Sequence, residues 1–324
     1  MNILVTGGAG YIGSHTVKML LEKGFNVTVF DNLSRGHIES IPKGIPCEIV
    51  NLLDFENLKS SFRKYIFDAI IHFAAFAYVG ESTENPEMYF ENNVSGSNNL
   101  IYLANENGVK HFVFSSTCSL YGNPLKTPIS EKEIVKPINP YAKTKMIVEE
   151  ILDFYDISYG MKHIALRYFN AAGASDDSSI GESHDPEPHL IPLVLYTALG
   201  KLDIIRIYGD DYNTKDGTCI RDYIHVNDLA DAHIRALELL IRNNQSDVIN
   251  LGTGVGYSVK EIISKAREIT GREIKSEIIQ RRQGDPDSLV ADNQKAKNIL
   301  GWVPEYDLDR IIETAWKWHQ NQKY

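Results

Sequence analysis

Short apolar runs alternate with helix-length amphipathic stretches along the first half of the chain. The runs are rich in β-branched and aromatic residues and apolar throughout, which is typical of strands buried on both faces of a parallel sheet. We expect such strands at residues 3–5, 27–30, 48–50, 69–73, 112–114 and 164–168. The segments between them repeat apolar residues at i, i+3 and i+4, as residues 17–21 do before Gly24. This alternation predicts an α/β fold with a Rossmann-like, doubly wound parallel sheet.

The second half of the chain lacks the regular alternation of strands and helices. Residues 171–189 are rich in Gly, Ser, Asp and Pro, which predicts a loop. The later elements are mixed: strands near 204–208 and 248–251, a helix with a Ser258–Glu261 capping box that ends at Gly271, and a helix over 308–319. We therefore expect a first domain over residues 1–170, with added segments from about 213–245, and a smaller mixed α/β domain over 171–324.

Composition excludes several classes of function. Apolar residues make up 43% and charged residues 23% of the 324 positions, which is an ordinary globular balance. The 43 acidic against 33 basic residues give a net charge of −10, which disfavours nucleic acid and anionic membrane as partners. An anionic small molecule is not excluded, because it meets only local charge.

The cysteines and the hydropathy profile bear on the cellular compartment. Cys47, Cys118 and Cys219 are odd in number and lack CxxC spacing, so we expect neither a disulfide framework nor a structural zinc site. The chain begins in a predicted strand without a leader, and no apolar run approaches the length of a membrane span. We expect a soluble cytoplasmic protein.

A glycine-rich turn follows the first predicted strand. Its sequence is Gly7-Gly8-Ala9-Gly10-Tyr11-Ile12-Gly13, and a helix is predicted directly after it. Such a turn permits a tight bend, lets the backbone approach a pyrophosphate and points a helix N-terminus at negative charge. The alternative is a glycine-rich turn that binds nothing. The predicted strand and helix on either side favour a dinucleotide site.

Asp31 ends the second predicted strand, 18 residues after Gly13. A carboxylate at this place can bind the adenosine ribose hydroxyls and repels a 2′-phosphate, so NAD is favoured over NADP. Arg35 lies close by and leaves NADP open, and a surface turn acid is the alternative for Asp31.

Tyr141 and Lys145 lie four residues apart at the start of a predicted helix, so both project from one face. A free tyrosine has a pKa of about 10 and is a poor base at neutral pH. A nearby ammonium group favours the phenolate. By itself a YxxxK pair on an amphipathic helix is usually without function, but here it follows the glycine turn. Thr117, after the 112–114 strand, can hold or relay the proton, or can simply cap a turn.

These features resemble the extended short-chain dehydrogenases that act on nucleotide sugars, and the UDP-glucose 4-epimerase family in particular. Further stretches carry the resemblance across essentially the whole chain: His72-Phe73-Ala74-Ala75, Val79-Gly80-Glu81-Ser82, Asn92-Asn93-Val94, Tyr121-Gly122, Arg167-Tyr168-Phe169-Asn170, residues 217–226, Asn250-Leu251-Gly252 and residues 281–285. The resemblance implies a tightly bound NAD, a UDP-hexose substrate and a homodimer built through two helices of the first domain.

The resemblance also implies roles for individual residues. The first domain would bind NAD and the second the UDP-sugar. Catalysis would fall to Tyr141, Lys145 and Thr117. The expected cofactor residues are Gly7, Gly10, Tyr11, Ile12, Gly13, Asp31, Asn32, Asn51, Leu52, Phe73, Ala74, Ala77, Asn92, Tyr141, Lys145 and Phe169. The expected substrate residues are Thr117, Asn170, His189, Leu190, Arg206, Tyr208, Arg221, Arg282, Asp285 and Leu289. Arg221 and Arg282 suit a diphosphate, the alternative being surface ion pairs with Asp222 or Asp285. Tyr208 would stack on uracil or belong to the core.

The chain departs from the family pattern at five positions. Thr117 replaces a frequent Ser and keeps the hydroxyl. Asn51 replaces an acid that meets the adenine amino group, and Ala77 replaces a Lys that contacts the cofactor diphosphate. His189 stands where Asn is common, and Leu289 stands at the gate of the sugar pocket. The last difference leaves acceptance of N-acetylated sugars open.

The activity implied is interconversion of UDP-glucose and UDP-galactose through a 4-keto sugar. The alternatives are a UDP-N-acetylglucosamine 4-epimerase, a decarboxylase, a 4,6-dehydratase and a non-catalytic dinucleotide-binding protein. Cys118 and Ser119 occupy the positions where dehydratases carry an acid pair. Metal catalysis is not expected, because His184 and His189 lie in a polar loop without helical ligand spacing. The absence of a GxSxG sequence disfavours hydrolysis.

Overall fold

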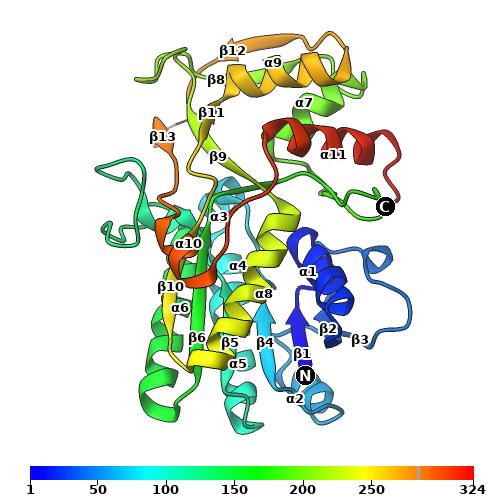
Figure 1. The fold of residues 1–324 in the computed structure, drawn as a ribbon, viewed down its shortest axis with the longest axis vertical. Helices are drawn as coiled ribbons and strands as arrows, with labels where there is room; N and C mark the ends of the chain where they lie inside the picture. The colour runs from blue at the N-terminus through cyan, green and yellow to red at the C-terminus, as the bar shows by residue number, and fades with distance from the viewer. Residues whose placement is uncertain (283–284) are drawn as a thin grey trace. The chain divides into compact units, whose positions relative to one another are not determined.

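A seven-stranded sheet organises the first part of the computed structural model, which describes residues 1–282 and 285–324 (Figure 1). The strand order is β10-β6-β5-β4-β1-β2-β3. The strands are β1 (Asn2–Thr6), β2 (Asn26–Asp31), β3 (Cys47–Ile49), β4 (Ala69–His72), β5 (His111–Ser115), β6 (Lys162–Tyr168) and β10 (Asp247–Leu251). Neighbours from β6 to β3 pair in parallel, and the order reverses at β1, as in a doubly wound sheet. The predicted fold class is confirmed.

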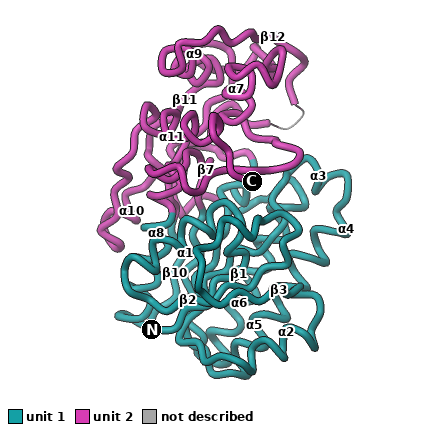
Figure 2. Tube along the Cα trace, turned by 90° about the vertical axis from the view of Figure 1, so that its right-hand side faces the viewer, with its two compact units in different colours: residues 1–122, 135–167, 230–249 teal, residues 123–134, 168–229, 250–324 magenta. Residues whose placement is uncertain are grey.

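The chain divides into two compact units (Figure 2). Unit 1 comprises residues 1–122, 135–167 and 230–249, and unit 2 comprises residues 123–134, 168–229 and 250–324. The strand predicted at 248–251 is the edge strand β10 beside β6, rather than part of the later mixed elements. Sequence order alone cannot show this, because strand pairing is a tertiary property.

Helices cover both faces of the sheet in unit 1. They are α1 (Tyr11–Glu22), α2 (Phe55–Phe62), α3 (Val79–Glu84), α4 (Pro86–Tyr89), α5 (Gly96–Glu106), α6 (Pro140–Tyr159) and α8 (Val226–Asn243), with the π-helix η2 (Phe90–Ser95) and the short 3-10 helices η1 (Ile38–Ser40) and η3 (Cys118–Tyr121). The apolar sides of α2, α5 and α6 form one core with the strands, including Phe62, Leu100 and Leu152. Figure 1 shows α1 and α8 side by side, and Lys23 of α1 pairs with Asp231 of α8.

Helix α6 begins and ends where its sequence predicts. The Asn139 side chain accepts a hydrogen bond from the Ala142 N–H, and Pro140 occupies the first helical position. Gly160 follows in the left-handed conformation that glycine adopts at low cost. The cap thus sets where the helix begins and places Tyr141 in its first turn.

Unit 2 contains a small sheet centred on β9 and a second, two-stranded sheet. Its strands are β7 (Asn170–Ala172), β8 (Ile205–Tyr208), β9 (Ile220–His225), β11 (Gly256–Ser258), β12 (Ser276–Ile279) and β13 (Ser288–Leu289). Strand β9 pairs with β7, β11 and β13, and β8 pairs with β12. The helices are α7 (Leu190–Ala198), α9 (Val259–Thr270), α10 (Gln294–Leu300) and α11 (Leu308–Gln320).

The predicted elements of unit 2 are largely present. Helix α9 has the predicted capping box and ends at left-handed Gly271, and α11 matches the predicted 308–319 helix within one residue. One expectation was incomplete, because the loop predicted at 171–189 begins inside β7. A three-residue strand is too short for periodicity to reveal.

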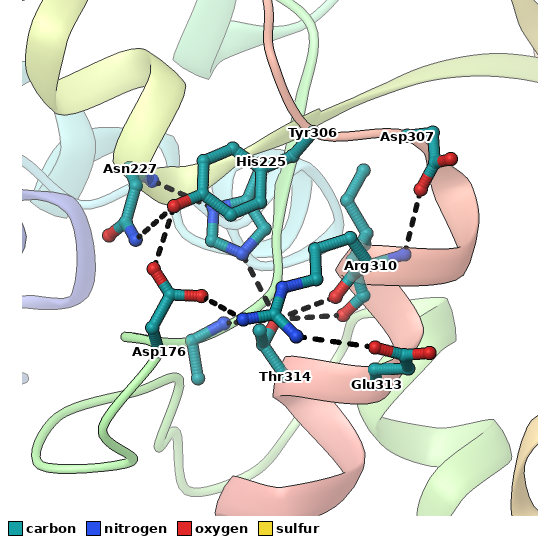
Figure 3. A network of polar contacts seen from close by, with 10 residues as sticks. Asp176, His225, Asn227, Tyr306, Asp307, Arg310, Glu313 and Thr314 are labelled. Atoms are coloured by element: carbon teal, nitrogen blue, oxygen red, sulfur yellow. Dashed lines mark hydrogen bonds and ion pairs between the residues drawn. The ribbon is translucent and has the colours of Figure 1, made fainter.

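A polar network joins the segment after β7 to α11 (Figure 3). The Tyr306 ring stacks on His225 with centroids 3.9 Å apart, and its hydroxyl donates to Asp176 at 2.7 Å. Asp176 also pairs with Arg310, and His225 Nε2 lies 3.0 Å from the Thr314 hydroxyl. His225, from the 217–226 stretch that carries the family resemblance, therefore helps to hold Tyr306 and α11 in place within unit 2. Among the described residues, no helix is both long and apolar enough to span a membrane.

Asp222 is the hydrogen-bonding centre of unit 2. Its fully buried carboxylate accepts from the Thr253 N–H and hydroxyl, the Gly254 N–H and the Ala291 N–H, at 2.6–3.2 Å. Burial raises the pKa of this carboxyl group, and the hydrogen bonds oppose that rise. The alternative raised for Arg221, a pair with Asp222, is therefore not what the structure shows, because Asp222 binds backbone groups.

We expect Asp222→Ala to lower the free energy of unfolding of unit 2 by about 2–4 kcal/mol, because several buried backbone donors lose the carboxylate that accepts their hydrogen bonds. All three tryptophans, Trp302, Trp316 and Trp318, lie in unit 2, so their fluorescence during urea unfolding measures this unit.

Glu277→Ala is the matched control for that substitution. Glu277 forms an exposed pair with Arg206, and its removal should change the same free energy by less than about 0.5 kcal/mol. Equal effects of the two substitutions would show that Asp222 does not organise the unit.

Candidate active site

The glycine-rich turn after β1 forms the floor of a groove in unit 1. Gly7 has a positive φ of 72°, and a Cβ on Gly13 would lie only 2.1 Å from the Gly7 carbonyl oxygen. The turn is therefore possible only with glycine at these places. Gly10 occupies the N-cap of α1 and has no side chain to occupy the first backbone N–H groups of the helix. Those groups and the helix dipole suit an anion such as a pyrophosphate.

Asp31 lies at the end of β2 and lines the same groove. Its carboxylate accepts from the Ala9 N–H at 2.9 Å and from the Leu33 N–H at 2.8 Å. Burial raises the pKa of Asp31, and these backbone hydrogen bonds act against the rise. Arg35 also lines the groove, and its guanidinium pairs with Glu81 at 2.6 Å. The positive charge that left NADP open is thus already bound by a carboxylate.

The groove collects most of the predicted cofactor residues. It is lined by Gly7, Gly10, Asp31, Asn32, Asn51, Leu52, Phe73, Ala74 and Asn92. The other predicted cofactor residues, Tyr11, Ile12, Gly13, Ala77, Tyr141, Lys145 and Phe169, are not part of this lining. Sequence reasoning noted Arg35 only as a residue near Asp31 and Ala75 only within the 72–75 stretch, and it missed the lining residues Phe30, Ser34, Gly36, Val50 and Phe76. These residues lie at or just after the carboxyl ends of β2, β3 and β4, so the rule that ligands bind at strand ends could have found them.

Lys145 is buried against the end of β5. Its Nζ donates to the Ser115 carbonyl at 2.8 Å and lies 4.9 Å from the centre of the Phe114 ring. Burial lowers the pKa of Lys145 to about 7, although the charge of Glu149 opposes the shift. The amine therefore changes its charge near neutral pH, where an ordinary lysine is fully protonated.

Tyr141 is the second residue of α6 and stands one turn before Lys145. Thr117 lies two residues beyond β5, and its hydroxyl oxygen accepts from the Ser119 N–H at 3.1 Å, which caps η3. The capping alternative for Thr117 is thus observed, and the hydroxyl hydrogen still serves as a donor. The three predicted catalytic residues all belong to unit 1 and come from α6 and the carboxyl end of β5.

A second buried set ties α6 to the sheet. Glu149, two turns after Tyr141, accepts from the Ser116 hydroxyl and from Arg167 through Nε and Nη2. Arg167 also donates to the Tyr121 hydroxyl at 3.2 Å. Glu149 and Arg167 are both under 10% exposed, so each of these buried charges requires the other to neutralise it. Sequence reasoning did not identify Glu149, because one acid on a helix carries no distinguishing signal.

Several of the predicted substrate residues of unit 2 lie on or beside β8, β9 and β13. The Arg221 guanidinium pairs with Asp285, and the Arg282 guanidinium lies 4.0 Å from the centre of the Tyr208 ring. Leu289 is the register partner of Arg221 across β13 and β9. The ion-pair alternative is therefore observed for Arg221, through Asp285. The neighbouring Gln283 and Gly284 of the 281–285 stretch lie outside the described residues.

Three other predicted substrate residues of unit 2 lie on β7, α7 and β8. Asn170 starts β7 and Leu190 starts α7. Arg206, on the exposed face of β8, pairs with Glu277 of β12. Arg281, which sequence reasoning missed, lies 3.9 Å from the centre of the Tyr212 ring. Its position directly before Arg282 was the available signal.

His189 is held by two acids. Its Nδ1 lies 2.8 Å from both Glu182 Oε1 and Glu187 Oε1. Burial lowers the pKa of His189, but the two carboxylates outweigh burial and raise the pKa to about 10. His189 is thus part of a charged cluster at the N-cap of α7.

Comparison with known proteins places this site in a family. A family model described as GDP-mannose 4,6 dehydratase matches residues 4–315. The chain is 49% identical to the UDP-glucose 4-epimerase of Lacticaseibacillus casei over 99% of this chain and 97% of that protein.

Solved structures give the same result. The UDP-glucose 4-epimerase of Brucella ovis in complex with NAD matches with a TM-score of 0.95 at 48% identity, covering 98% of this chain and 97% of that one. The Bifidobacterium longum enzyme in complex with NAD+ and UDP matches with a TM-score of 0.93 at 35% identity and 99% coverage of both chains. With this similarity running through both units, the chain belongs to the UDP-glucose 4-epimerase family of extended short-chain dehydrogenases.

Proposed function

We propose that this protein interconverts UDP-glucose and UDP-galactose by NAD-dependent oxidation and re-reduction at C4 of the sugar. The observation that carries this proposal is the placement of Tyr141 and Lys145 one turn apart on α6, with the lysine Nζ held by the carbonyl at the end of β5. A phenol beside an amine at a strand end suits removal of a proton from an alcohol. The relatives from Brucella and Bifidobacterium, whose structures hold NAD, support the same reading.

The groove of unit 1 fits NAD. The uncapped start of α1 would hold the pyrophosphate, and the Asp31 carboxylate would accept hydrogen bonds from the adenosine ribose hydroxyls. Asn51 and Leu52 would lie along the adenine, with Phe73, Ala74 and Asn92 farther along the cofactor. NAD bound in this groove would supply a hydride acceptor for C4 of the sugar and, in the reverse step, the hydride donor.

Tyr141 would act as the base. As a phenolate it takes the proton of the sugar 4-hydroxyl, and it gives the proton back in the second half of the reaction. Lys145 in its charged form stabilises the phenolate by electrostatic attraction. Thr117, with its oxygen engaged by Ser119, donates its hydrogen either to the 4-oxygen or to Tyr141. The reaction has no net redox change, so the protein should keep its NAD between turnovers.

Unit 2 would bind the UDP group. Arg221 and Arg282 supply the positive charge that a diphosphate requires in a chain of net charge −10. The Arg221–Asp285 pair and the Arg282–Tyr208 stack orient both guanidinium groups before the substrate arrives. Tyr208 would offer its ring to uracil. Firm retention of the nucleotide leaves the 4-keto sugar free to turn over.

The rival reactions lack their chemical groups at this site. Elimination of water by a dehydratase requires an acid and a base after Thr117, where this chain has Cys118 and Ser119 on η3. A non-catalytic binding protein has no need of a buried lysine beside a tyrosine. Acceptance of N-acetylated sugars depends on the space beside Leu289, and an assay with UDP-N-acetylglucosamine measures it.

We also propose that the protein is a homodimer that associates through α5 and α6. These helices expose large apolar side chains on unit 1: Tyr102 is 43% exposed, Phe154 68% and Ile157 80%. Such side chains on neighbouring helices are typical of a buried interface.

Purified protein without added NAD should convert UDP-glucose to UDP-galactose, and Tyr141→Phe should lower kcat about 100-fold or more, because the base is lost. Product analysis by chromatography measures both. Tyr155→Phe, on the same helix, is the control and should leave kcat within about twofold. Near-normal turnover by Tyr141→Phe would rule out the proposed mechanism, and a stable 4-keto product or released carbon dioxide would indicate one of the rival reactions.

The stability of the NAD-free protein should rise with pH because of Lys145. Its pKa is about 7 in the folded state and near 10.5 when unfolded, so between these values the unfolded state binds more protons. Raising the pH therefore favours the folded state by up to about 1.4 kcal/mol per pH unit, and the gain is lost as pH falls to 7.

Urea unfolding followed by circular dichroism at pH 7, 8 and 9 measures this dependence. Lys145→Met should remove the slope, whereas Lys143→Met, at an exposed position of the same helix, should retain it. Parallel curves for wild type and Lys145→Met would contradict a neutral buried amine.

Sedimentation should show a dimer of two 36.5 kDa chains. Ile157→Glu should convert it to a monomer, because an unpaired carboxylate would be buried at the interface. Ile66→Glu is the control, since Ile66 is 82% exposed but lies outside α5 and α6. A wild-type monomer, or equal effects of both substitutions, would exclude this interface.

A further inference from the structure

Four potential metal ligands converge in the loop that precedes α7. They are Glu182, His184, Glu187 and His189, and one donor atom from each lies within 4.8 Å of the others. All four belong to unit 2 and to a stretch of eight residues. The sequence analysis set these histidines aside because they lack helical spacing. An irregular loop that folds back on itself brings the donors together without that spacing.

Imidazole nitrogens and carboxylate oxygens alternate in a ring, which is closed by both oxygens of Glu187. His184 Nδ1 lies 3.4 Å from Glu182 Oε1 and 3.4 Å from Glu187 Oε2. His189 Nδ1 lies 2.8 Å from Glu182 Oε1 and from Glu187 Oε1. In a tetrahedral zinc site with bonds of about 2.0–2.1 Å, neighbouring ligand atoms are about 3.3 Å apart. The two 3.4 Å contacts match this spacing and the two 2.8 Å contacts are about 0.5 Å shorter, so small side-chain shifts would accommodate a zinc ion.

Hydrogen bonds among the four residues do not account fully for this ring. Each Nδ1 carries at most one hydrogen but faces two carboxylates, so at most two hydrogens serve four contacts. The carboxylate oxygen Oε2 of Glu187 is buried and makes no hydrogen bond to any residue that the structure describes, and the side chains of Glu182 and Glu187 are under 5% exposed. Two buried carboxylates require two compensating positive charges. In the metal-free cluster the two imidazoles supply these charges when both are protonated; one divalent cation would supply both, displace the two protons and contact all four residues.

We propose that Glu182, His184, Glu187 and His189 bind one zinc ion, and that this ion has a structural role. Two imidazole nitrogens favour zinc over magnesium or calcium, which prefer oxygen ligands. Four protein ligands close the coordination shell, as in structural rather than catalytic sites.

The surroundings of the cluster agree with a structural role. The Trp318 Nε1–H donates to the Glu182 carbonyl at 2.8 Å, and the Ser183 hydroxyl donates to the Tyr324 carbonyl at 3.0 Å. His189 is the N-cap of α7, directly before Leu190. A metal at this place would therefore fasten the loop and the C-terminal residues to the start of α7, where a predicted UDP-binding residue lies.

Metal analysis of the protein purified through a tag without histidines is the first test. After dialysis against zinc and gel filtration, mass spectrometry of the metal should give about one zinc per chain. X-ray absorption at the zinc edge should show nitrogen and oxygen ligands at about 2.0–2.1 Å and no sulfur, which excludes binding by cysteine. Absence of stoichiometric zinc, or a sulfur shell, would overturn the proposal.

Stability measurements give a second readout that does not depend on catalysis. Chelation should lower the thermal midpoint of the wild-type protein by about 5 °C or more, and added zinc should restore it. His184→Gln and Glu187→Gln should lose both the zinc and the response to chelator.

His163→Gln is the matched control, because it removes a buried imidazole that pairs with Asp153 elsewhere in the chain, and it should keep both properties. Should the loop variants fail to fold, the chelation and re-addition series on wild type still decides the outcome. No response to chelator, or zinc retained by the two variants, would show that the cluster is only an ion-pair network.

Discussion

The position of α6 on the parallel sheet depends on buried charges that only their partners can satisfy. Lys145 is held by the Ser115 carbonyl, and Glu149 one turn later is held by Ser116 and Arg167. A rotation of the helix would leave the amine or the carboxylate buried without a partner, which costs several kcal/mol for the charged group. The same contacts set where Tyr141 projects, so the constraint that stabilises the fold also positions the proposed base.

The backbone, rather than side chains, shapes the cofactor groove. The turn after β1 approaches itself so closely at Gly7 and Gly13 that a single methyl group would not fit. The buried Asp31 carboxylate lines the same groove and is fixed by two backbone N–H groups. A site built in this way is preformed, so little conformational entropy is lost when a dinucleotide binds.

Unit 2 uses ion pairs and stacking to hold its polar residues in place. Arg221 is oriented by Asp285, Arg282 by the Tyr208 ring, and His189 by two glutamates. The residues that would bind UDP thus already have neighbours that fix their geometry. The cluster of Glu182, His184, Glu187 and His189 and the hydrogen bonds to Asp222 likewise hold the loops of unit 2 in place.

The sequence by itself determined the sheet, the glycine turn, the capped start of α6 and the family, because each rests on local patterns that repeat within a few residues. It did not reveal the role of Glu149, the place of β10 in the first sheet, or the convergence of Glu182, His184, Glu187 and His189. Each of these features depends on residues that meet only in the folded protein, by strand pairing, by burial of a charge or by the folding of a loop. None of them produces a periodic pattern in the sequence. Tertiary structure decided them, because a buried charge has meaning only beside the group that neutralises it.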